Sequence, residues 1–413
     1  MTSTSTSSCR SGRPLSIAPL DALSVLDLRG YAALEVAFGP GTHLIWGPNA
    51  AGKTSLLEAI ALLAWGRSHR TNADGELIRW GRDLARIEGR VGGEVLEVAI
   101  ARSGADGSSG RKRIRINGVG RRAASLGRIL RAVSFAPEDM LLVVGSPSLR
   151  RAAIDALAAA RFPAYADDLA TYGRTLQQRN SLLRSIREEQ ASREELRFWD
   201  DAFIDSGGRV VTARLGLLDD LAEPIAAAHR EIAPEEAAGG LTLRYATNSP
   251  TLSGETPRDA LARRLVDTAD KEIWNGSTVI GPHRDDVAFD LAARDLAGFA
   301  SRGQQRTAIL AFKLAELDLL TALDGRPPLL LLDDVFSELD PDRRGHLVRR
   351  IAALPQAFVT TTTPDDLDPA LRAIAHGWVV HPEPAGAELA QATAANHTSA
   401  AEDAAEVATE SLP

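Results

Sequence analysis

The residue types and spacing of one eight-residue segment suit phosphate binding. The segment matches G-x-x-x-x-G-K-[ST] at every fixed position, and its residues are Gly47, Pro48, Asn49, Ala50, Ala51, Gly52, Lys53 and Thr54. Glycines let the backbone curl so that successive N–H groups point at phosphate oxygens. Lys53 supplies a cation for the outer phosphates, and the Thr54 hydroxyl can ligate Mg²⁺. We therefore predict an ATP and Mg²⁺ site in which Lys53 serves both binding and catalysis.

The flanking residues predict the elements that position this segment. Residues 42–46 have the pattern of a short strand, and Lys53 to Trp65 that of a helix. The N-terminus of a helix carries partial positive charge, which attracts phosphate. The alternative is a glycine-rich turn without a ligand, and the strand and helix argue against it.

A second apolar run, Pro328 to Leu332, ends in Asp333 and Asp334. A strand buried on both faces has such a continuous apolar run, and in parallel sheets ligands lie beyond the carboxyl ends of the strands. We expect Asp333 to hold Mg²⁺ through water and Asp334 to orient or deprotonate the attacking water. The alternative is a strand followed by a helix-capping aspartate.

Residues 301–306 stand directly before an amphipathic segment, Thr307 to Leu320, that predicts a helix, and Ser301 or a neighbour would lie at its N-terminus. An N-terminal serine of this kind can lie where a helix binds anions. The alternative for Ser301 is an ordinary N-cap.

Composition is that of a globular protein, with 44% hydrophobic and 25% charged residues among 413. The single cysteine, Cys9, excludes a disulfide within the chain and fits a reducing cytosol. We expect neither a secretory signal nor a membrane span, because no apolar run is long enough. Six acids after Arg372 account for most of the net charge of −8, so the charge argues neither for nor against a nucleic-acid partner.

The pattern along the chain predicts an α/β fold in five segments. They are a disordered N-terminus (1–15), the first half of an ATPase head (16–146), a helical arm or lobe (147–272), the second half of the head (273–382) and a disordered acidic tail (383–413). Apolar seams from Tyr165 to Ile186 and from Val211 to Ile225 suit two antiparallel helices joined by a polar turn. Such an arm would project on the order of 40 Å, and a compact helical lobe with the same seams is equally consistent.

Together these motifs resemble the ATP-binding-cassette superfamily. Residues 301–306 resemble its signature sequence, residues 329–334 its Walker B strand and residues 337–340 its D-loop. In that superfamily two heads meet head-to-tail, and each ATP lies between the P-loop of one copy and the signature of the other. The resemblance implies a homodimer in which Ser301, Gly303 and Gln304 contact the nucleotide of the partner copy.

The separation of about 250 residues between Thr54 and Ser301 is typical of SMC-like heads split by a helical segment. The short segment is similar to the RecF family of bacterial recombination mediators. Local matches to that family are 28–31, 66–71, 135–140, 145–147, 281–286 and 333–340. A glutamine of the Q-loop type is not evident at 135–140.

Membership of the RecF family would imply an ATP-gated protein of DNA gap repair with slow, DNA-stimulated ATP hydrolysis. It would bind duplex and gapped DNA in the cytoplasm, at the nucleoid, and work with RecR and RecO to help RecA replace SSB, the single-strand binding protein. Three rivals are a structural SMC-like chromosome ATPase, a transporter subunit, and a nucleotide-switched clamp whose hydrolysis is incidental.

Sequence-independent DNA binding needs contacts to phosphate rather than to bases. The best basic cluster is Arg111, Lys112, Arg113 and Arg115, and alternation through Arg113, Arg115 and Asn117 suggests strand residues that face one side. The alternative is a solvated basic hairpin without a partner.

Overall fold

The computed structural model describes residues 19–103, 109–236, 240–382 and 386–392. The predicted disordered N-terminus lies outside these residues, as does most of the predicted tail. The chain divides into two compact units. Unit 1 contains Met1–Ala132, Pro328–Asp333 and Ala352–Pro413, and unit 2 contains Val133–Pro327 and Asp334–Ile351.

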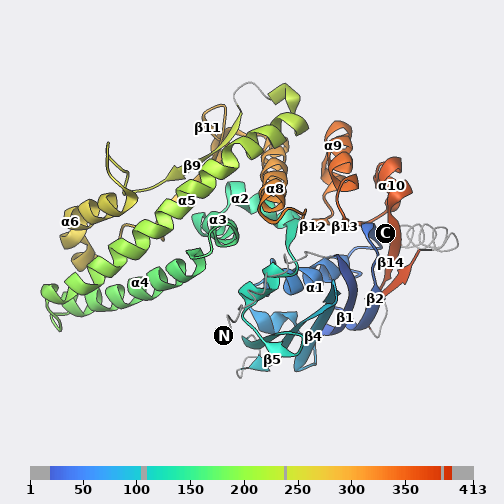
Figure 1. Cartoon of the computed structure of the whole chain (residues 1–413), viewed down its shortest axis with the longest axis horizontal. Coiled ribbons are helices and arrows are strands. Elements are labelled where there is room, and N and C mark those ends of the chain that lie inside the picture. Colours follow the sequence, from blue (N-terminus) through green and yellow to red (C-terminus); the bar gives the residue numbers. More distant parts are fainter. Residues whose placement is uncertain (1–18, 104–108, 237–239, 383–385, 393–413) are drawn as a thin grey trace, which may run out of the picture. The chain divides into compact units, whose positions relative to one another are not determined.

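Unit 1 has an antiparallel sheet with the strand order β2-β1-β4-β5-β6-β7 (Figure 1). The strands are β1 (Leu20–Leu28), β2 (Tyr31–Ala37), β4 (Leu84–Val91), β5 (Glu94–Ser103), β6 (Ser109–Ile116) and β7 (Val119–Gly120). Burial alternates along β4, where Ala85, Ile87 and Val91 are buried. The sheet therefore has one apolar face and one solvated face.

The strands of the second sheet that lie wholly in unit 1 follow the order β15-β14-β3-β13-β12. Its strands are β3 (Gly41–Trp46), β12 (Leu329–Asp333), β13 (Gln356–Thr361), β14 (His376–His381) and β15 (Glu388–Gln391). The pairs β12–β13, β13–β3 and β14–β3 are parallel, and β14–β15 is antiparallel. The strands predicted at 42–46 and 329–332 are thus confirmed.

One part of the predicted disordered tail is folded. Residues 388–391 form β15, and Leu389 packs against the apolar core of unit 1. The pairing with β14 and the partial burial of Leu389 outweigh the alanine-rich, acidic composition that favoured disorder.

Helix α1 (Lys53–Trp65) is apolar on all sides and forms the centre of this core. Ten of its thirteen residues are buried, and they pack with residues of both sheets of unit 1. The helix spans the residues predicted for it, and the short helix α10 (Pro369–Ile374) also belongs to unit 1.

Unit 2 is mainly helical. Its helices are α2 (Leu141–Val144), α3 (Pro147–Arg161), α4 (Tyr165–Arg187), α5 (Leu196–Ile232), α6 (Pro257–Asn275), α7 (Leu296–Phe299), α8 (Arg302–Asp324) and α9 (Pro341–Ala352). Its strands are β9 (Leu241–Ala246), β10 (Asp286–Leu291) and β11 (Arg294–Asp295), in the order β11-β10-β9, and the chain enters the unit through β8 (Ala132–Phe135). Helix α8 extends the predicted 307–320 helix in both directions.

Helices α4 and α5 lie antiparallel within unit 2 (Figure 1), as the seams predict. Ion pairs join Arg179 to Asp200 at 2.7 Å and Asp168 to Arg209 at 2.6 Å. The seam of α4 passes through Arg179, whose side chain is 2% exposed and also contacts Glu272 at 2.7 Å. The apolar spacing from Val211 to Ile225 predicts that Ala222 belongs to the seam of α5. This prediction is wrong, because Ala222 is exposed and Leu221 is buried instead.

Within the part of the chain that the structure describes, no helix combines the length and hydropathy needed to cross a bilayer.

Candidate functional site

The loop before α1 adopts backbone conformations that favour glycine. Gly47 and Gly52 have φ angles of 150° and 117°, and Ala50 is also left-handed at 63°. A Cβ atom at Gly47 would lie 2.3 Å from the carbonyl oxygen of Val380, and one at Gly52 would lie 3.1 Å from the Cβ atom of Ala387. The segment 47–54 is therefore a tight loop that packs against neighbouring backbone, as phosphate cradles do.

Lys53 is the first residue of α1, and its side chain folds back into this loop. Its Nζ atom donates to the carbonyl oxygens of Gly47 at 2.7 Å and Pro48 at 2.9 Å. The ammonium group is thus held at the helix N-terminus, where the helix dipole adds to its charge. Thr54, the predicted Mg²⁺ ligand, is the next residue and is partly exposed.

Side chains from the strands and turns around the loop support its shape. The Tyr31 hydroxyl donates to the carbonyl oxygen of Gly52 at 3.1 Å. Glu58 on α1 is fully buried and accepts hydrogen bonds from Arg29 at 2.9 Å and from Ser68 at 2.5 Å. Burial opposes ionisation of Glu58, but these bonds together with the charges of Arg29 and Arg70 hold its pKa below the usual value.

These supporting residues lie in the segments 28–31 and 66–71, which the sequence marked only through a family resemblance. The sequence alone did not predict that Arg29, Tyr31, Ser68 and Arg70 support the loop. A glutamate inside an otherwise apolar helix was the available signal, because a buried carboxylate requires cationic or hydrogen-bonding partners.

Asp333 lies at the carboxyl end of β12, as predicted. Its side chain is 6% exposed and accepts a hydrogen bond from the Thr360 hydroxyl at 2.6 Å. Thr360 pairs with Asp333 on one side and with Ile45 of β3 on the other. Since β3 runs directly into Gly47, the Asp333 carboxylate and the loop lie at the same edge of one parallel sheet.

Asp334 belongs to unit 2 and lies just after the end of β12. Its φ angle of 50° is left-handed, a conformation that is strained for a residue with a side chain and that recurs at functional sites. The Ser337 hydroxyl donates to the Asp334 carbonyl oxygen at 2.9 Å. The two predicted acids therefore differ in environment, since Asp333 belongs to a strand and Asp334 begins a turn.

Ser301 is the N-cap of α8 in unit 2. Its hydroxyl accepts from the backbone N–H of Gln304 at 3.3 Å, and the Gln304 side chain accepts from the Ser301 N–H at 3.0 Å. Ser301 itself is exposed, and Gly303 lies in the first turn of this 23-residue helix. Ser301 is thus an N-cap, as the alternative prediction states. Its side chain remains exposed in this role, so an anion can still reach it. Unit 1 holds Lys53 and Asp333, whereas unit 2 holds Asp334 and Ser301.

The segment 135–140, where no Q-loop glutamine is evident, is tied to helix α8. The Asp139 carboxylate caps the turn by accepting from the Ala136 N–H at 2.9 Å and lies 3.2 Å from the Lys313 ammonium. Burial would lower the pKa of Lys313, but Asp139 and Glu316 raise it above the usual value. This partly buried ion pair fixes the segment to the helix that Ser301 caps.

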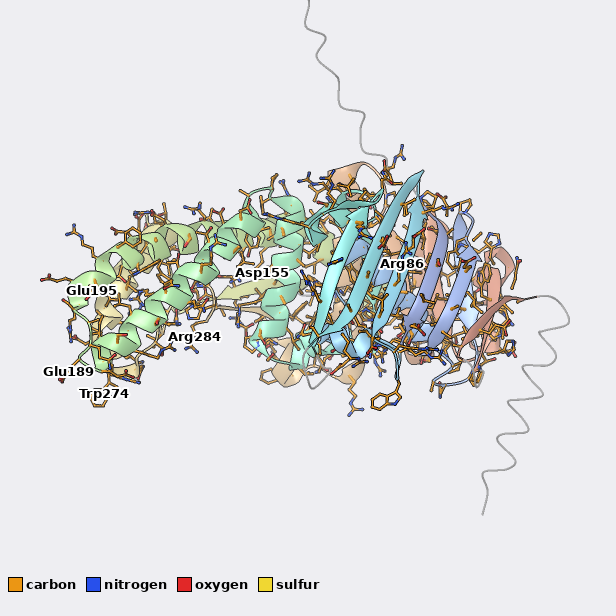
Figure 2. The ribbon with its side chains drawn as sticks, turned by 90° about the horizontal axis from the view of Figure 1, so that it is seen from below. Arg86, Asp155, Glu189, Glu195, Trp274 and Arg284 are labelled. Carbon is orange, nitrogen blue, oxygen red and sulfur yellow. The ribbon has the colours of Figure 1, made fainter. Side chains whose placement is uncertain are left out.

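The predicted DNA-binding residues divide between two faces of β6. Arg111, Arg113 and Arg115 are exposed on the solvated face of the antiparallel sheet. Arg86 lies on the same broad face (Figure 2) and contacts Glu88 at 2.9 Å and Glu97 at 3.1 Å.

Lys112 does not share a face of the sheet with these arginines. It points to the opposite face of β6 and forms an ion pair with Asp74 at 2.6 Å. Asn117 is also excluded from the row, because β6 ends at Ile116 and Asn117 turns the chain with a φ angle of 52°.

Comparisons with known proteins agree with this geometry. The family model described as the RecF/RecN/SMC N terminal domain matches residues 19–376. The DNA replication and repair protein RecF of Bacillus subtilis (strain 168) is 39% identical over 359 residues, which cover 84% of this chain and 94% of the relative. RecF of Symbiobacterium thermophilum is 39% identical over 357 residues, covering 84% and 92%.

Among solved structures, the recombination mediator protein RecF with ATP, in the RecFOR pathway, matches with a TM-score of 0.79 and 29% identity. The match covers 92% of this chain and 99% of the other. An Smc head domain with a coiled coil and joint from Pyrococcus yayanosii matches with a TM-score of 0.52 at 12% identity, which shows a shared fold alone.

The fold and the loop define an SMC-like ATPase head of the ATP-binding-cassette type, with a helical lobe inserted in it. Within that class, the chain belongs to the RecF family of DNA replication and repair proteins.

Proposed function

We propose that this chain is an ATP-gated DNA-binding protein of recombinational gap repair. One observation carries the proposal: the Lys53 loop and the Asp333 carboxylate lie at the same edge of one parallel sheet in a chain of the RecF family. That edge is where α/β proteins bind nucleotides. ATP binding by the solved RecF relative supports the same assignment.

Residues of unit 1 fit ATP and Mg²⁺. The loop N–H groups and Lys53 would hold the phosphates, and the Thr54 hydroxyl and Asp333 carboxylate are the hard oxygen donors that Mg²⁺ requires. Bound Mg²⁺ would neutralise charge on the phosphate oxygens. Thr360 supports this role, because its hydrogen bond at 2.6 Å orients the buried Asp333 carboxylate.

Asp334 is the proposed general base. It would orient the attacking water and accept its proton. The left-handed backbone at Asp334 turns the chain away from β12 and supports a role distinct from that of Asp333. A slow hydrolysis that DNA stimulates would then act as a timer.

The proposed active form is a homodimer. Ser301 caps a long helix that has Gly303 and Gln304 in its first turn, and Ser301 is exposed. The N-terminus of such a helix attracts anions. We infer that these three residues contact the γ-phosphate held by the P-loop of a second copy. ATP would then bind the dimer more tightly than the monomer and shift the population toward the dimer, and hydrolysis would release it.

DNA would contact the solvated face of the antiparallel sheet. Arg111, Arg113 and Arg115 stand at every second residue of β6, about 6.6 Å apart at the rise of a strand. That spacing is close to the separation of successive phosphates along one DNA strand, and such contacts carry no sequence preference. Glu97 lies 3.2 Å from Arg115 and partly offsets its charge.

The wider role follows from family membership. We propose that the dimer acts near single-strand gap edges of duplex DNA, at the nucleoid in the cytoplasm, and works with RecR and RecO to help RecA replace SSB. The description of the solved relative as a recombination mediator in the RecFOR pathway supports this role.

Size-exclusion chromatography with light scattering tests the proposal. The chain should run as a monomer without nucleotide and with ADP, and as a dimer with ATP, and gapped DNA should co-elute with the dimer. A chain that stays monomeric with ATP at every concentration would refute the gating. Full repair activity with a non-hydrolysable ATP would instead favour the nucleotide-switched clamp.

A further inference from the structure

Trp80 is an exposed aromatic side chain in the loop before β4 of unit 1. Its side chain is 97% exposed, so neither face of the indole ring is covered. Full exposure of so large an apolar surface is unfavourable in water, by about 25 cal/mol per Å² relative to a covered ring. A binding partner would recover that free energy.

The loop that carries Trp80 is held firmly to the sheet. The N–H of Arg79 donates to the carbonyl oxygen of Asp27 at 2.8 Å, and the N–H of Arg82 closes a turn onto the carbonyl oxygen of Arg79 at 3.0 Å. The Arg102 side chain donates to the carbonyl oxygen of Arg82 at 3.2 Å. The ring is therefore presented on a fixed support, which reduces the entropy that binding costs.

The surroundings of Trp80 are cationic. Arg79 and Arg82 flank it in the sequence, the side chain of Arg82 is 60% exposed, and Arg102 reaches the same loop. The acids beside them are Asp27, which lies 3.4 Å from Arg82, and Asp83, which lies 4.0 Å from Arg102. Asp27 also lies 4.0 Å from Arg79. The loop and the side chains that contact it thus hold three arginines and two acids, and this excess of positive charge favours an anionic ligand that also has an aromatic face.

The loop lies at the end of the sheet that Arg111 occupies. Leu84 of β4 pairs with Ala101 of β5, and Ala101 pairs with Arg111 of β6. Trp80 precedes Leu84 by four residues, so it lies just beyond this row. A nucleic acid that contacts the β6 arginines through its phosphates can therefore reach the ring.

We propose that Trp80 stacks on an unpaired base of DNA at the edge of a single-strand gap. Bases inside a duplex are covered on both faces by their neighbours, whereas an unpaired base offers a face to an aromatic side chain. Protein interfaces have a broad apolar core that is depleted of charge. On β1 and β4, the large apolar side chains that are exposed among the described residues are Leu26 and Leu84, each 45% exposed. The inference rests on the proposed DNA-binding function and adds to it a residue that distinguishes gapped from continuous DNA.

Equilibrium binding of the full chain with ATP to two labelled DNAs tests the inference. One DNA is a continuous duplex, and the other carries a gap of several unpaired nucleotides. Trp80→Ala should weaken binding to gapped DNA by roughly 5- to 150-fold, the equivalent of one stacked base, and leave binding to the duplex unchanged. Trp80→Phe should restore most of the loss. The control is Trp274→Ala, because Trp274 is 82% exposed in unit 2, on α6 (Figure 2), and should have no effect.

A third DNA, with abasic sites in place of the unpaired bases, separates stacking from other effects. The affinity of the wild-type chain for this DNA should be lower than for normal gapped DNA, by the same factor that Trp80→Ala loses on normal gapped DNA. The affinity of Trp80→Ala should be the same for the two gapped DNAs. Unchanged melting temperature would confirm that the variant is folded. Equal affinity of wild type and Trp80→Ala for gapped DNA would overturn the inference and favour a protein partner for Trp80. A wild-type chain that binds no DNA at all would instead refute the proposed function, and the inference with it.

Discussion

Glu58 has no exposed surface, and the Arg29 guanidinium lies 2.9 Å and 3.0 Å from its two carboxylate oxygens. Arg29 precedes Tyr31, which bonds to Gly52 in the P-loop, and Glu58 is on the helix that follows the loop. This pair therefore connects the segment before the loop to the helix after it.

Arg29→Met should destabilise unit 1 by about 2–3 kcal/mol, because a buried carboxylate loses its bidentate partner while Ser68 and Arg70 remain. Denaturant unfolding at pH 7 measures this change. Arg193→Met is the matched control, since Arg193 pairs with the 87% exposed Asp270 and should cost less than about 1 kcal/mol. Equal costs for the two variants would contradict the role of Arg29.

Stability should fall in mild acid because of His43. Burial lowers the pKa of His43 to about 4, while its Nε2 atom bonds to the Gly39 carbonyl oxygen and its Nδ1 atom accepts from Trp378. The unfolded chain binds a proton near pH 6.5 and the folded chain does not until about pH 4. The free energy of unfolding should therefore drop between these values, by about 2 kcal/mol at pH 5.

His43→Gln tests this, because glutamine does not titrate. Its stability should depend less on pH between 7 and 5 than that of the wild type. Parallel stability curves for the two chains would show that His43 does not contribute. His283 in unit 2 should add a similar fall, since burial lowers its pKa to about 4 as well.

The β6 arginines should contribute to DNA affinity through charge alone. Replacing Arg111, Arg113 and Arg115 together by alanine should weaken duplex binding and reduce the slope of log K against log salt by about 2–3. Lys112→Gln removes a charge from the same strand but from the opposite face, so it should leave that slope unchanged. A larger effect of Lys112→Gln would place the DNA on the other face.

Asp334→Asn should retain ATP-dependent dimers and lower kcat for ATP hydrolysis by roughly 100-fold or more, as loss of a general base does. DNA complexes should then live longer. Hydrolysis at the wild-type rate would assign the base to another residue. If repair also remained complete without hydrolysis, the clamp interpretation would be preferred.

Much of the nucleotide site could be predicted because its signals are local. The P-loop pattern, the apolar run before Asp333 and the helix after Ser301 each lie within a few residues of sequence, and the structure has the expected elements there. The side chains that hold the loop in place could not be predicted, because Arg29 and Glu58 are 29 residues apart and meet only through the fold.

The helical seams show a second limit. The spacing of apolar residues identifies the buried face of α4. Position 179 lies on that face but is an arginine, so the apolar pattern is interrupted there. Arg179 is buried because Asp200, Glu272 and the Thr278 hydroxyl satisfy its guanidinium, each at 2.7 Å. Polar positions in a core depend on such partners, which periodicity does not reveal.

Ser301 has two separable roles, as a helix cap and as a predicted contact to the partner's nucleotide. Ser301→Asp keeps the cap, because aspartate is as good an N-cap as serine, but places a negative charge against phosphate. It should fold normally and fail to dimerise with ATP, and Ser301→Arg should also fail. If Ser301→Asp formed dimers at the ATP concentrations that suffice for the wild type, Ser301 would act as a helix cap alone.

The central claim is that each ATP lies between Lys53 of one copy and Ser301 of the other, and mixing two defective chains tests it directly. Light scattering with ATP should show monomers for Lys53→Ala alone and for Ser301→Arg alone, with Lys271→Ala, an exposed lysine on α6, as the dimerising control. A mixture of the two defective chains should form dimers, because each heterodimer regains one intact site from Lys53 of one chain and Ser301 of the other. A mixture that stays monomeric while the wild type dimerises, or full dimerisation of either variant alone, would contradict the account.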